Sequence, residues 1–499
     1  MLTSIDHENP MSRPPSRLHS TVEPAAALHP AAAPHSGAAR DSAVALDPAA
    51  VHARALLRAC GLDAELAHRG SVPSPEIEWA VSGAMALTGW PEGPPRFAAG
   101  GLATAARGVG MALRHLAPRT PLASLDAPAL LGERAAIAGL KAAGDTSVGG
   151  SARLLASRDG ALALNLPRDE DWELVPAWLA AEDASFVGGR DWKRLAEIVA
   201  TRDPRELEER GRLIGLAVAW ARRDVPADRS IFTNRHPTKA DPHSAARPIR
   251  LLDLSNLWAG PLAGSLLGMA GIDVLKVESP ARPDGARRGP APFFDLMNAG
   301  KRSCALDLNR ASDRETFQRL LEGADIVLES SRARALTQFG FDAVDWVAAS
   351  PGRIWASITG HGRSHEWIAF GDDAAVAAGL AWSPDGSDTR PCFCADAVAD
   401  PTTGLHVAAI VLAHLRSGRG GLLDFSLVDV AAQAANVTQA DVRLPIERID
   451  GLWHVVDQDR AIPIAKPRAR TSLGRAPSLA PIGARSSGPS AISEWIGKC

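Results

Sequence analysis

Apolar residues recur at helical spacing over much of the first half of the chain. The segments 51–69, 100–117 and 191–223 place an apolar residue at every third or fourth position, which predicts helices. Residues 151–166 alternate apolar and polar side chains on both sides of a turn, which predicts a β-hairpin. We therefore expect residues 46–225 to form a folded unit that is mostly helical.

From residue 248 the pattern changes to short apolar runs that alternate with amphipathic segments. The predicted strands are 249–255, 273–279, 324–330 and 353–360, and the predicted helices are 262–271, 314–324 and 342–350. Strands and helices that alternate in this way form a parallel sheet covered on both faces. The expected fold class is therefore α/β, with ligands bound at the carboxyl ends of the strands.

Three segments lack such patterns. Residues 1–45 are rich in Pro, Ala, Ser and His, which predicts a disordered N-terminal extension. Residues 226–247 are polar and interrupted by proline, as in a linker. Residues 441–499 are rich in Arg, Pro and Ser and predict an extended C-terminal tail. This division leaves residues 248–440 as the α/β domain.

Composition narrows the function classes. A chain of 499 residues predicts two domains, and 54 basic against 57 acidic residues give no charge excess for nucleic-acid binding. No apolar run approaches the roughly 18 residues of a membrane span, and the N-terminus lacks a secretory pattern. The five cysteines are scattered, and the C-x-C pair at 392–394 has no further ligands nearby. We expect a cytoplasmic protein without a metal site, away from membranes and nucleic acid.

Common catalytic signatures are missing from the sequence. It has no phosphate-binding P-loop, dinucleotide fingerprint, serine-hydrolase elbow or zinc motif. The unusual feature is a strand–loop–helix unit whose loop, NLWAGP, occupies residues 256–261.

Six motifs follow one another within residues 248–435. They are the A-G-P loop, the K-V-E strand after it, MNAGKRSCALDL (297–308), ADIVLES (324–330), SITGHG (357–362) and DAVADPTTG (396–404) before G-R-G-G. In this order they resemble the class III (family III) CoA-transferases, of the CaiB/BaiF type. The resemblance implies a Rossmann-like parallel-sheet domain plus a smaller α+β domain. It also implies a homodimer of interlocked subunits that binds acyl-CoA and carboxylate substrates.

The resemblance also implies roles for particular residues. Asp400 matches the family's catalytic aspartate, a covalent nucleophile that carries CoA as an aspartyl thioester. The implied CoA contacts are Trp258, Ala259 and Gly260 of the A-G-P loop, Arg282 and Lys301 near the phosphates, and Ser330 and Ser331, which stand where the family often has Asn-Phe. Coenzyme A is then a substrate, and no tightly bound cofactor is implied.

The residues around Asp400 suit a nucleophile. Pro401 favours the first turn of a helix, so we expect Asp400 to be its N-cap, close to free backbone N–H groups. Such donors could stabilise a tetrahedral oxyanion. The simpler interpretation is that Asp400 only caps the helix.

The N-terminal half resembles a degenerate partial copy of the second half. Residues 80–116 resemble residues 375–415, and Thr104 then falls opposite Asp400. The sequence that flanks Thr104 offers no base, so we expect residues 46–225 to be structural.

Two other functions stay open. The 2-methylacyl-CoA racemases share the fold and use a histidine in a G-H-D motif, where this chain has Gly371-Asp372-Asp373. A racemase-like enzyme is therefore the first alternative. A non-catalytic CoA-binding paralogue is the second, suggested by Thr104 and by the altered Ser330-Ser331 position.

Overall fold

The structure is a computed structural model that describes residues 46–66, 72–180, 190–240, 247–332, 334–383, 389–438, 444–479 and Trp495. The expected N-terminal extension lies outside the described residues. Among the residues that are described, no helix is long and apolar enough to cross a membrane.

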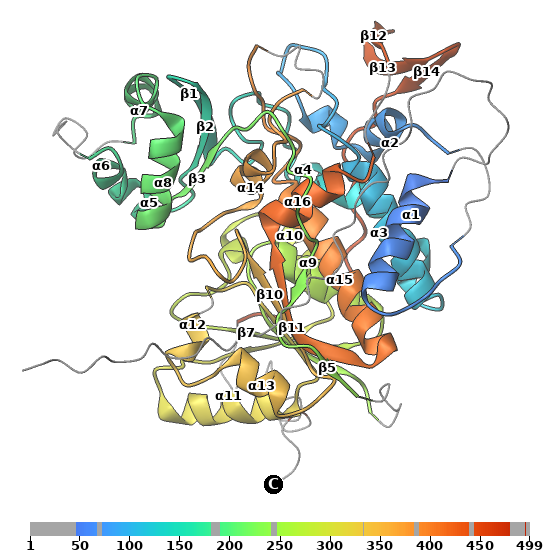
Figure 1. The fold of residues 1–499 in the computed structure, drawn as a ribbon, viewed down its shortest axis with the longest axis vertical. Coiled ribbons are helices and arrows are strands. Elements are labelled where there is room, and N and C mark those ends of the chain that lie inside the picture. The colour runs from blue at the N-terminus through green and yellow to red at the C-terminus, as the bar shows by residue number, and fades with distance from the viewer. Residues whose placement is uncertain are drawn as a thin grey trace, which may run out of the picture.

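A sheet of eight strands forms the centre of the C-terminal half (Figure 1). Its parallel strands are β6 (Arg250–Leu254), β7 (Asp273–Glu278), β8 (Arg302–Ala305), β9 (Ile326–Glu329), β10 (Ile354–Thr359) and β11 (Arg419–Ser426). They lie in the order β11-β10-β9-β6-β7-β8. Numbered along the chain, this is the 3-2-1-4-5-6 order of dinucleotide-binding folds, read from the other edge. The predicted parallel sheet is confirmed.

Helices cover both faces of this sheet. The helices of this half are α9 (Ala259–Met269), α10 (Ala291–Asn298), α11 (Ala311–Gly323), α12 (Arg334–Thr337), α13 (Ala343–Ala348), α14 (Gly371–Ala377), α15 (Ala399–Ser417) and α16 (Leu427–Ala435), with a short 3₁₀ helix η5 (Gly285–Arg288). Of these, α9, α11, α13, α15 and α16 pack on the strands of the sheet. Successive strand residues point to opposite faces. Leu251 therefore joins the core under α9 and α15, whereas Leu252 joins the separate core under α11 and α13.

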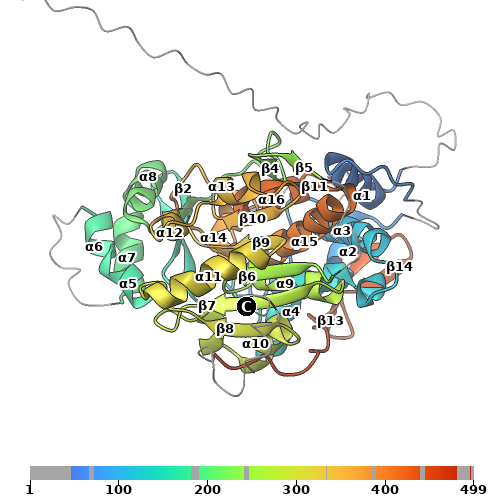
Figure 2. The ribbon, with the colours of Figure 1, turned by 90° about the horizontal axis from the view of Figure 1, so that it is seen from below.

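The N-terminal half supplies two further groups of elements (Figures 1 and 2). The first packs beside α15 and consists of α1 (Pro48–Ala59), α2 (Pro75–Ser82), η1 (Met85–Leu87), α3 (Leu102–Leu116), η2 (Pro121–Ser124), η3 (Ala127–Gly132) and α4 (Glu133–Ala138). The second is a smaller α+β unit of β1 (Ala152–Ser157), β2 (Gly160–Asn165), α5 (Asp169–Glu173), α6 (Val175–Trp178), α7 (Trp192–Val199), α8 (Pro204–Ile214) and β3 (Ala217–Trp220).

The predicted hairpin is confirmed, because β1 and β2 pair antiparallel. The helix predicted over residues 191–223 is wrong in extent. Asp203 caps a new helix that begins at Pro204, and the chain then leaves the helix to form β3 at the edge of the small sheet.

Two pairs of helices, α9 with α15 and α1 with α3, approach each other closely at a glycine. A Cβ added at Gly404 of α15 would lie 2.6 Å from the carbonyl oxygen of Ala259 at the start of α9. A Cβ added at Gly108 of α3 would lie 2.6 Å from the carbonyl oxygen of Ala49 at the start of α1. Glycine at each position allows the two backbones to approach closely. A partial second copy would produce this parallel, but the copy itself stays a prediction.

The expected linker and tail contain strands that we did not predict. β4 (Thr233–Asn234) and β5 (Thr238–Lys239) pair antiparallel with β11. β12 (Ile446–Ile449), β13 (Leu452–Asp457) and β14 (Arg460–Pro463) form a small antiparallel sheet. The turn between β12 and β13 is Asp450-Gly451, with both residues at positive φ, a sequence signal for a hairpin. The chain then runs back across the N-terminal half, where the Ala465 amide donates to Ala80.

Candidate active site

A cavity of about 910 Å³ lies at the carboxyl ends of the parallel strands. Its wall includes the loop after β6, where Asn256 and Leu257 lie, and the loop after β9, where Ser330 lies. The Asn256 amide donates to the Ser330 hydroxyl at 2.9 Å and joins the two loops. β6 and β9 are neighbours where the strand order reverses, which is the place where open α/β sheets bind ligands.

Five of the eight predicted site residues line this cavity. They are Ala259, Arg282, Ser330, Ser331 and Asp400. They come from four separate segments of the chain, which the sheet topology brings to one edge. The other three predicted residues, Trp258, Gly260 and Lys301, are not among those that line it.

Trp258 and Gly260 shape the loop from inside. The Trp258 ring is buried and meets the Phe293 ring edge-on, with 5.3 Å between centroids. The guanidinium of Arg134 lies 5.1 Å from the centre of the same indole. A side chain at Gly260 would collide with Ser255, so glycine is required for the close approach of α9 to its own loop. Both residues thus position the loop and do not face the cavity.

The prediction that Lys301 contacts a CoA phosphate does not fit the structure. Its ammonium is buried beneath α9 and donates to Asp253 Oδ2 at 2.8 Å, to the Pro261 carbonyl at 2.9 Å and to Asn298 Oδ1 at 3.0 Å. These three bonds use all the donors that a lysine has. Burial lowers the pKa of Lys301 to about 8, although Asp253 acts in the opposite direction.

A second buried lysine holds the same loop. Lys276 donates to the Ser255 carbonyl at 2.7 Å and lies 3.0 Å from Asp284 Oδ2. Asp284 in turn accepts from the Leu257 amide at 2.9 Å. Leu257 has φ of 68°, an unfavourable value for a leucine, and its side chain is exposed at the cavity. The buried Lys276 and Asp284 therefore fix the apolar side chain of Leu257 at the cavity. Sequence reasoning did not identify Leu257 as a site residue.

Asp400 lies in the first turn of α15 and is not the expected N-cap. The helix begins at Ala399, one residue earlier, and the Asp400 amide donates to the Ala397 carbonyl at 2.9 Å. The carboxylate is half-buried and accepts a hydrogen bond from the backbone of Gly371. Burial raises the pKa of Asp400 to about 7, and Asp372 raises it further while Arg134 lowers it. The group therefore changes charge near neutral pH.

Two more carboxylates lie behind Asp400. Asp372 Oδ1 accepts from the Ala397 amide at 3.0 Å, and burial raises the pKa of Asp372 to about 6. Asp396 is fully buried and forms a paired ion bridge with Arg134, with Nε to Oδ2 at 3.0 Å. Neither Asp372 nor Asp396 is among the residues that line the cavity.

Arginines line the same cavity. Arg168 pairs with Asp171 at 2.7 Å, and Arg334 pairs with Glu366 at 3.3 Å. Arg282 and Arg332 also line it, and the described residues place no acidic side chain in an ion pair with either. Sequence reasoning found only Arg282, although Arg332 follows a strand end in the same way.

Thr104 has a carboxylate partner that the flanking sequence did not reveal. Its buried hydroxyl donates to Glu78 of α2, and Glu78 also accepts from Arg107, which pairs with Asp47. Burial raises the pKa of Glu78.

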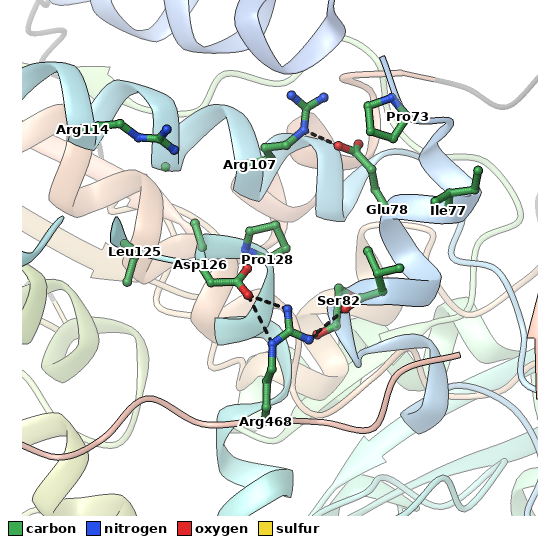
Figure 3. A pocket seen from close by; sticks show the side chains of 13 residues that line it. Pro73, Ile77, Glu78, Ser82, Arg107, Arg114, Leu125, Asp126, Pro128 and Arg468 are labelled. Carbon is green, nitrogen blue, oxygen red and sulfur yellow. Dashed lines mark hydrogen bonds and ion pairs between the residues drawn. The ribbon is translucent and has the colours of Figure 1, made fainter. Parts of the chain in front are cut away.

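A second cavity, of about 420 Å³, lies between α2 and α3 (Figure 3). Glu78 and Arg107 line it, whereas Thr104 does not. Arg468, which also lines it, pairs with Asp126. The Thr104 hydroxyl is therefore buried away from this cavity and bonded to Glu78.

Metal ligands do not gather in this part of the structure. Across the described ranges, no group of three or more His, Cys, Asp or Glu side chains has a geometry that could hold a metal ion.

Comparisons with known proteins match the C-terminal half. Residues 247–448 match the model of CoA-transferase family III. A succinate–glutarate CoA-transferase of Agrobacterium fabrum is 31% identical over 205 residues, which cover 36% of this chain and 50% of that protein. A formyl-CoA:oxalate CoA-transferase of Escherichia coli O6:H1 is 28% identical over 221 residues, which cover 42% of this chain and 52% of that protein. The chain spans about half the length of the curated relatives it matches.

A solved structure of a CAIB/BAIF family protein from Brucella suis also matches. It is 27% identical over 43% of this chain and 64% of its own, with a TM-score of 0.36.

Proposed function

We propose that the protein moves CoA between carboxylic acids with Asp400 as covalent nucleophile, because residues 247–448 match the CoA-transferase family III model and similar proteins are named as CoA-transferases. One observation carries the proposal. A carboxylate that changes charge near neutral pH lines the same cavity as Ala259, Arg282, Ser330 and Ser331, at the ligand-binding edge of the sheet.

The chemistry needs only carboxylates and the CoA thiol. An oxygen of ionised Asp400 attacks the donor thioester carbonyl, the C–S bond breaks, and a mixed anhydride and CoA thiolate form. The thiolate then attacks the Asp400 carbonyl carbon and releases the donor acid, which leaves an aspartyl-CoA thioester. The acceptor carboxylate reverses both steps. Each step exchanges one anion for another, so no net proton is taken up or released.

The position of Asp400 supports this role. The dipole of a helix favours negative charge at its N-terminus. Asp400 lies in the first turn of α15, so this dipole would favour the charge of a tetrahedral oxyanion next to the nucleophile.

The rest of the cavity suits a CoA ester. Its volume lies in the usual range of ligand pockets, about 300–1,000 Å³. Arg282 and Arg332 are cations that suit phosphates, and Leu257 offers an apolar surface to the pantetheine arm. Ala259 and the serines after β9 would contact the same ligand. We propose CoA as a substrate that leaves with each turnover.

Similar proteins indicate which acids to test first. The matched relatives are named for succinate, glutarate, formyl-CoA and oxalate. The experiment incubates the purified chain with succinyl-CoA or formyl-CoA and each acceptor, and separates the CoA esters by chromatography. We expect a new CoA ester of the acceptor with at least one pair. Hydrolysis alone, or no exchange with any pair, would contradict the proposal.

The racemase-like alternative has less support. It needs a second proton-transfer group opposite Asp400, and Asp372, in the place of the family histidine, binds the Ala397 amide behind the cavity wall. Exchange of the α-proton of a 2-methylacyl-CoA in D₂O would reveal that activity.

Binding of CoA without CoA transfer and without loss of the α-proton would instead indicate a non-catalytic paralogue. A homodimer and a cytoplasmic location stay predictions.

A further inference from the structure

The segment directly before Asp400 is strained. Ala395 has φ of 52° and Ala397 has φ of 45°. Alanine rarely adopts this left-handed region, because its Cβ then comes too close to the backbone carbonyl oxygen. Backbone strain of this kind persists only when surrounding contacts fix it. The segment 395–397 sets the direction in which α15 starts, and therefore where the Asp400 carboxylate lies.

Each of the three residues in this segment has its own anchor. The Ala395 amide donates to the Thr88 hydroxyl at 2.9 Å. The Asp396 carboxylate pairs with Arg134. The Ala397 amide donates to Asp372 at 3.0 Å. Thr88 and Arg134 both belong to the N-terminal half, so two of the three anchors come from residues for which no catalytic role was predicted.

Arg134 makes the one contact of the three that is a buried, two-bond ion pair. Its Nε lies 3.0 Å from Asp396 Oδ2, and its Nη2 bonds the other oxygen. Asp396 is fully buried, and a buried carboxylate without its partner is strongly unfavourable. The same guanidinium lies against the Trp258 ring, so one side chain contacts both the A-G-P loop and the segment before Asp400.

Arg134 also affects the charge state of Asp400, because its cation lowers the pKa of that carboxylate. The charged groups that act on Asp400 are Asp372 of α14, Asp396 of the strained segment and Arg134 of α4. Arg134 is the single cation among these three groups. Without it, two carboxylates would oppose the ionisation of a third.

We propose that Arg134 is a positioning residue for Asp400: it holds segment 395–397 in its strained conformation and balances the negative charge beside the nucleophile. This inference rests on the proposed role of Asp400. It gives the N-terminal half a part in the reaction, although we predict no transfer centre in that half.

The test compares Arg134→Gln with Arg134→Lys and with the control Arg470→Gln. Arg470 pairs with buried Glu133 at the start of α4, so the control also breaks a buried ion pair near this helix but does not touch segment 395–397. The readout is kcat and KM for CoA transfer as a function of pH.

We expect Arg134→Gln to lower kcat at pH 7 by about tenfold or more and to move the apparent pKa of kcat upward, with a smaller change in KM. Arg134→Lys keeps the charge but cannot form the paired bond, so its pKa should move less while kcat still falls. Arg470→Gln should lower the melting temperature and leave the pH profile in place. A profile that Arg134→Gln and Arg134→Lys leave unchanged, or that Arg470→Gln moves equally, overturns the inference.

A second readout does not depend on activity. The carboxyl carbon of Asp400 is titrated by ¹³C NMR in the wild type and in the two Arg134 variants. Its resonance is assigned as the one that is absent from the spectrum of Asp400→Asn. A higher pKa of Asp400 in Arg134→Gln than in the wild type supports the positioning role. A wild type that transfers no CoA would refute only the proposed function and would leave this result standing. If Arg134→Gln does not fold, Arg134→Lys decides by the same measurements: kcat and pKa both equal to those of the wild type overturn the inference.

Discussion

The Nζ atom of Lys301 lies 2.8 Å from Oδ2 of Asp253. Both side chains are buried beneath α9, the helix whose first three residues are Ala259, Gly260 and Pro261. Lys301 and Lys276 hold the pKa of Asp253 below its usual value, although burial acts in the opposite direction. The pair therefore stabilises the loop, and its lysine is not available to a phosphate.

Lys301→Met should act on stability rather than on CoA affinity. It leaves the Asp253 carboxylate buried without its main partner, which typically costs about 3–5 kcal/mol. Arg282→Ala, a change at the exposed cavity rim, should instead raise KM for the CoA ester and leave kcat and stability nearly unchanged. Denaturant unfolding and steady-state kinetics of both variants check the contrast. A Lys301→Met variant of wild-type stability with a raised KM would restore the phosphate-binding interpretation.

The rate of transfer should depend on pH near neutrality. Burial raises the pKa of Asp400 to about 7, and only the ionised carboxylate can attack. The sign follows directly: kcat rises as pH increases through about 7 and falls below it. An aspartate in water, with a pKa of about 3.9, would give no such change. A kcat profile that stays flat across neutral pH would count against ionisation of Asp400 as the controlling step.

Thr104→Val should lower stability without affecting transfer. The hydroxyl donates to buried Glu78, and its loss leaves one carboxylate oxygen with an unmet bond, at about 1–3 kcal/mol. Thr316→Val, at a half-buried position of α11 whose hydroxyl donates to the Ser312 carbonyl at the surface, is the matched control and should change either property little. Loss of activity in Thr104→Val at full stability would show that the N-terminal half has a reactive centre.

Residues 240–499 expressed alone should aggregate or be inactive. Helix α15 packs against α1 and α3, and His406 lies 2.9 Å from His52, nitrogen to nitrogen, in this interface. Removal of the N-terminal half would expose this apolar surface and would also remove Thr88 and Arg134. Size-exclusion chromatography and the transfer assay provide the check. A soluble, monomeric and fully active fragment would require another role for the N-terminal half.

The sequence predicted those features that depend on local pattern. Buried strands such as 326–329 appear as apolar runs, and their order makes the position of the cavity predictable. The direction of a side chain is different, because it depends on packing. Lys301 and Trp258 occupy motif positions near the cavity but point into the core.

Long-range contacts were beyond sequence reasoning. Arg134 and Asp396 are 262 positions apart, and Glu78 precedes Thr104 by 26. No spacing rule connects such residues, because only the packing of α4 and α2 against distant elements brings them together. The strands of the tail differ, since the Asp450-Gly451 turn was a local signal that we did not use.

The most direct test of the account is to trap CoA on Asp400. The wild type and Asp400→Asn are mixed with an acyl-CoA that supports exchange, treated with a phosphine to remove CoA from cysteine disulfides, and then digested with trypsin. This step matters because trypsin does not cut between Arg390 and Pro391, so the tryptic peptide 364–416 contains Cys392 and Cys394 as well as Asp396 and Asp400. Hydroxylamine then converts any aspartyl thioester to a hydroxamate, which fragment mass spectra assign to one residue. We predict a hydroxamate at Asp400 in the wild type and none in Asp400→Asn. Exchange activity in the wild type with no modification at Asp400, or with the modification at Asp396, would contradict the account.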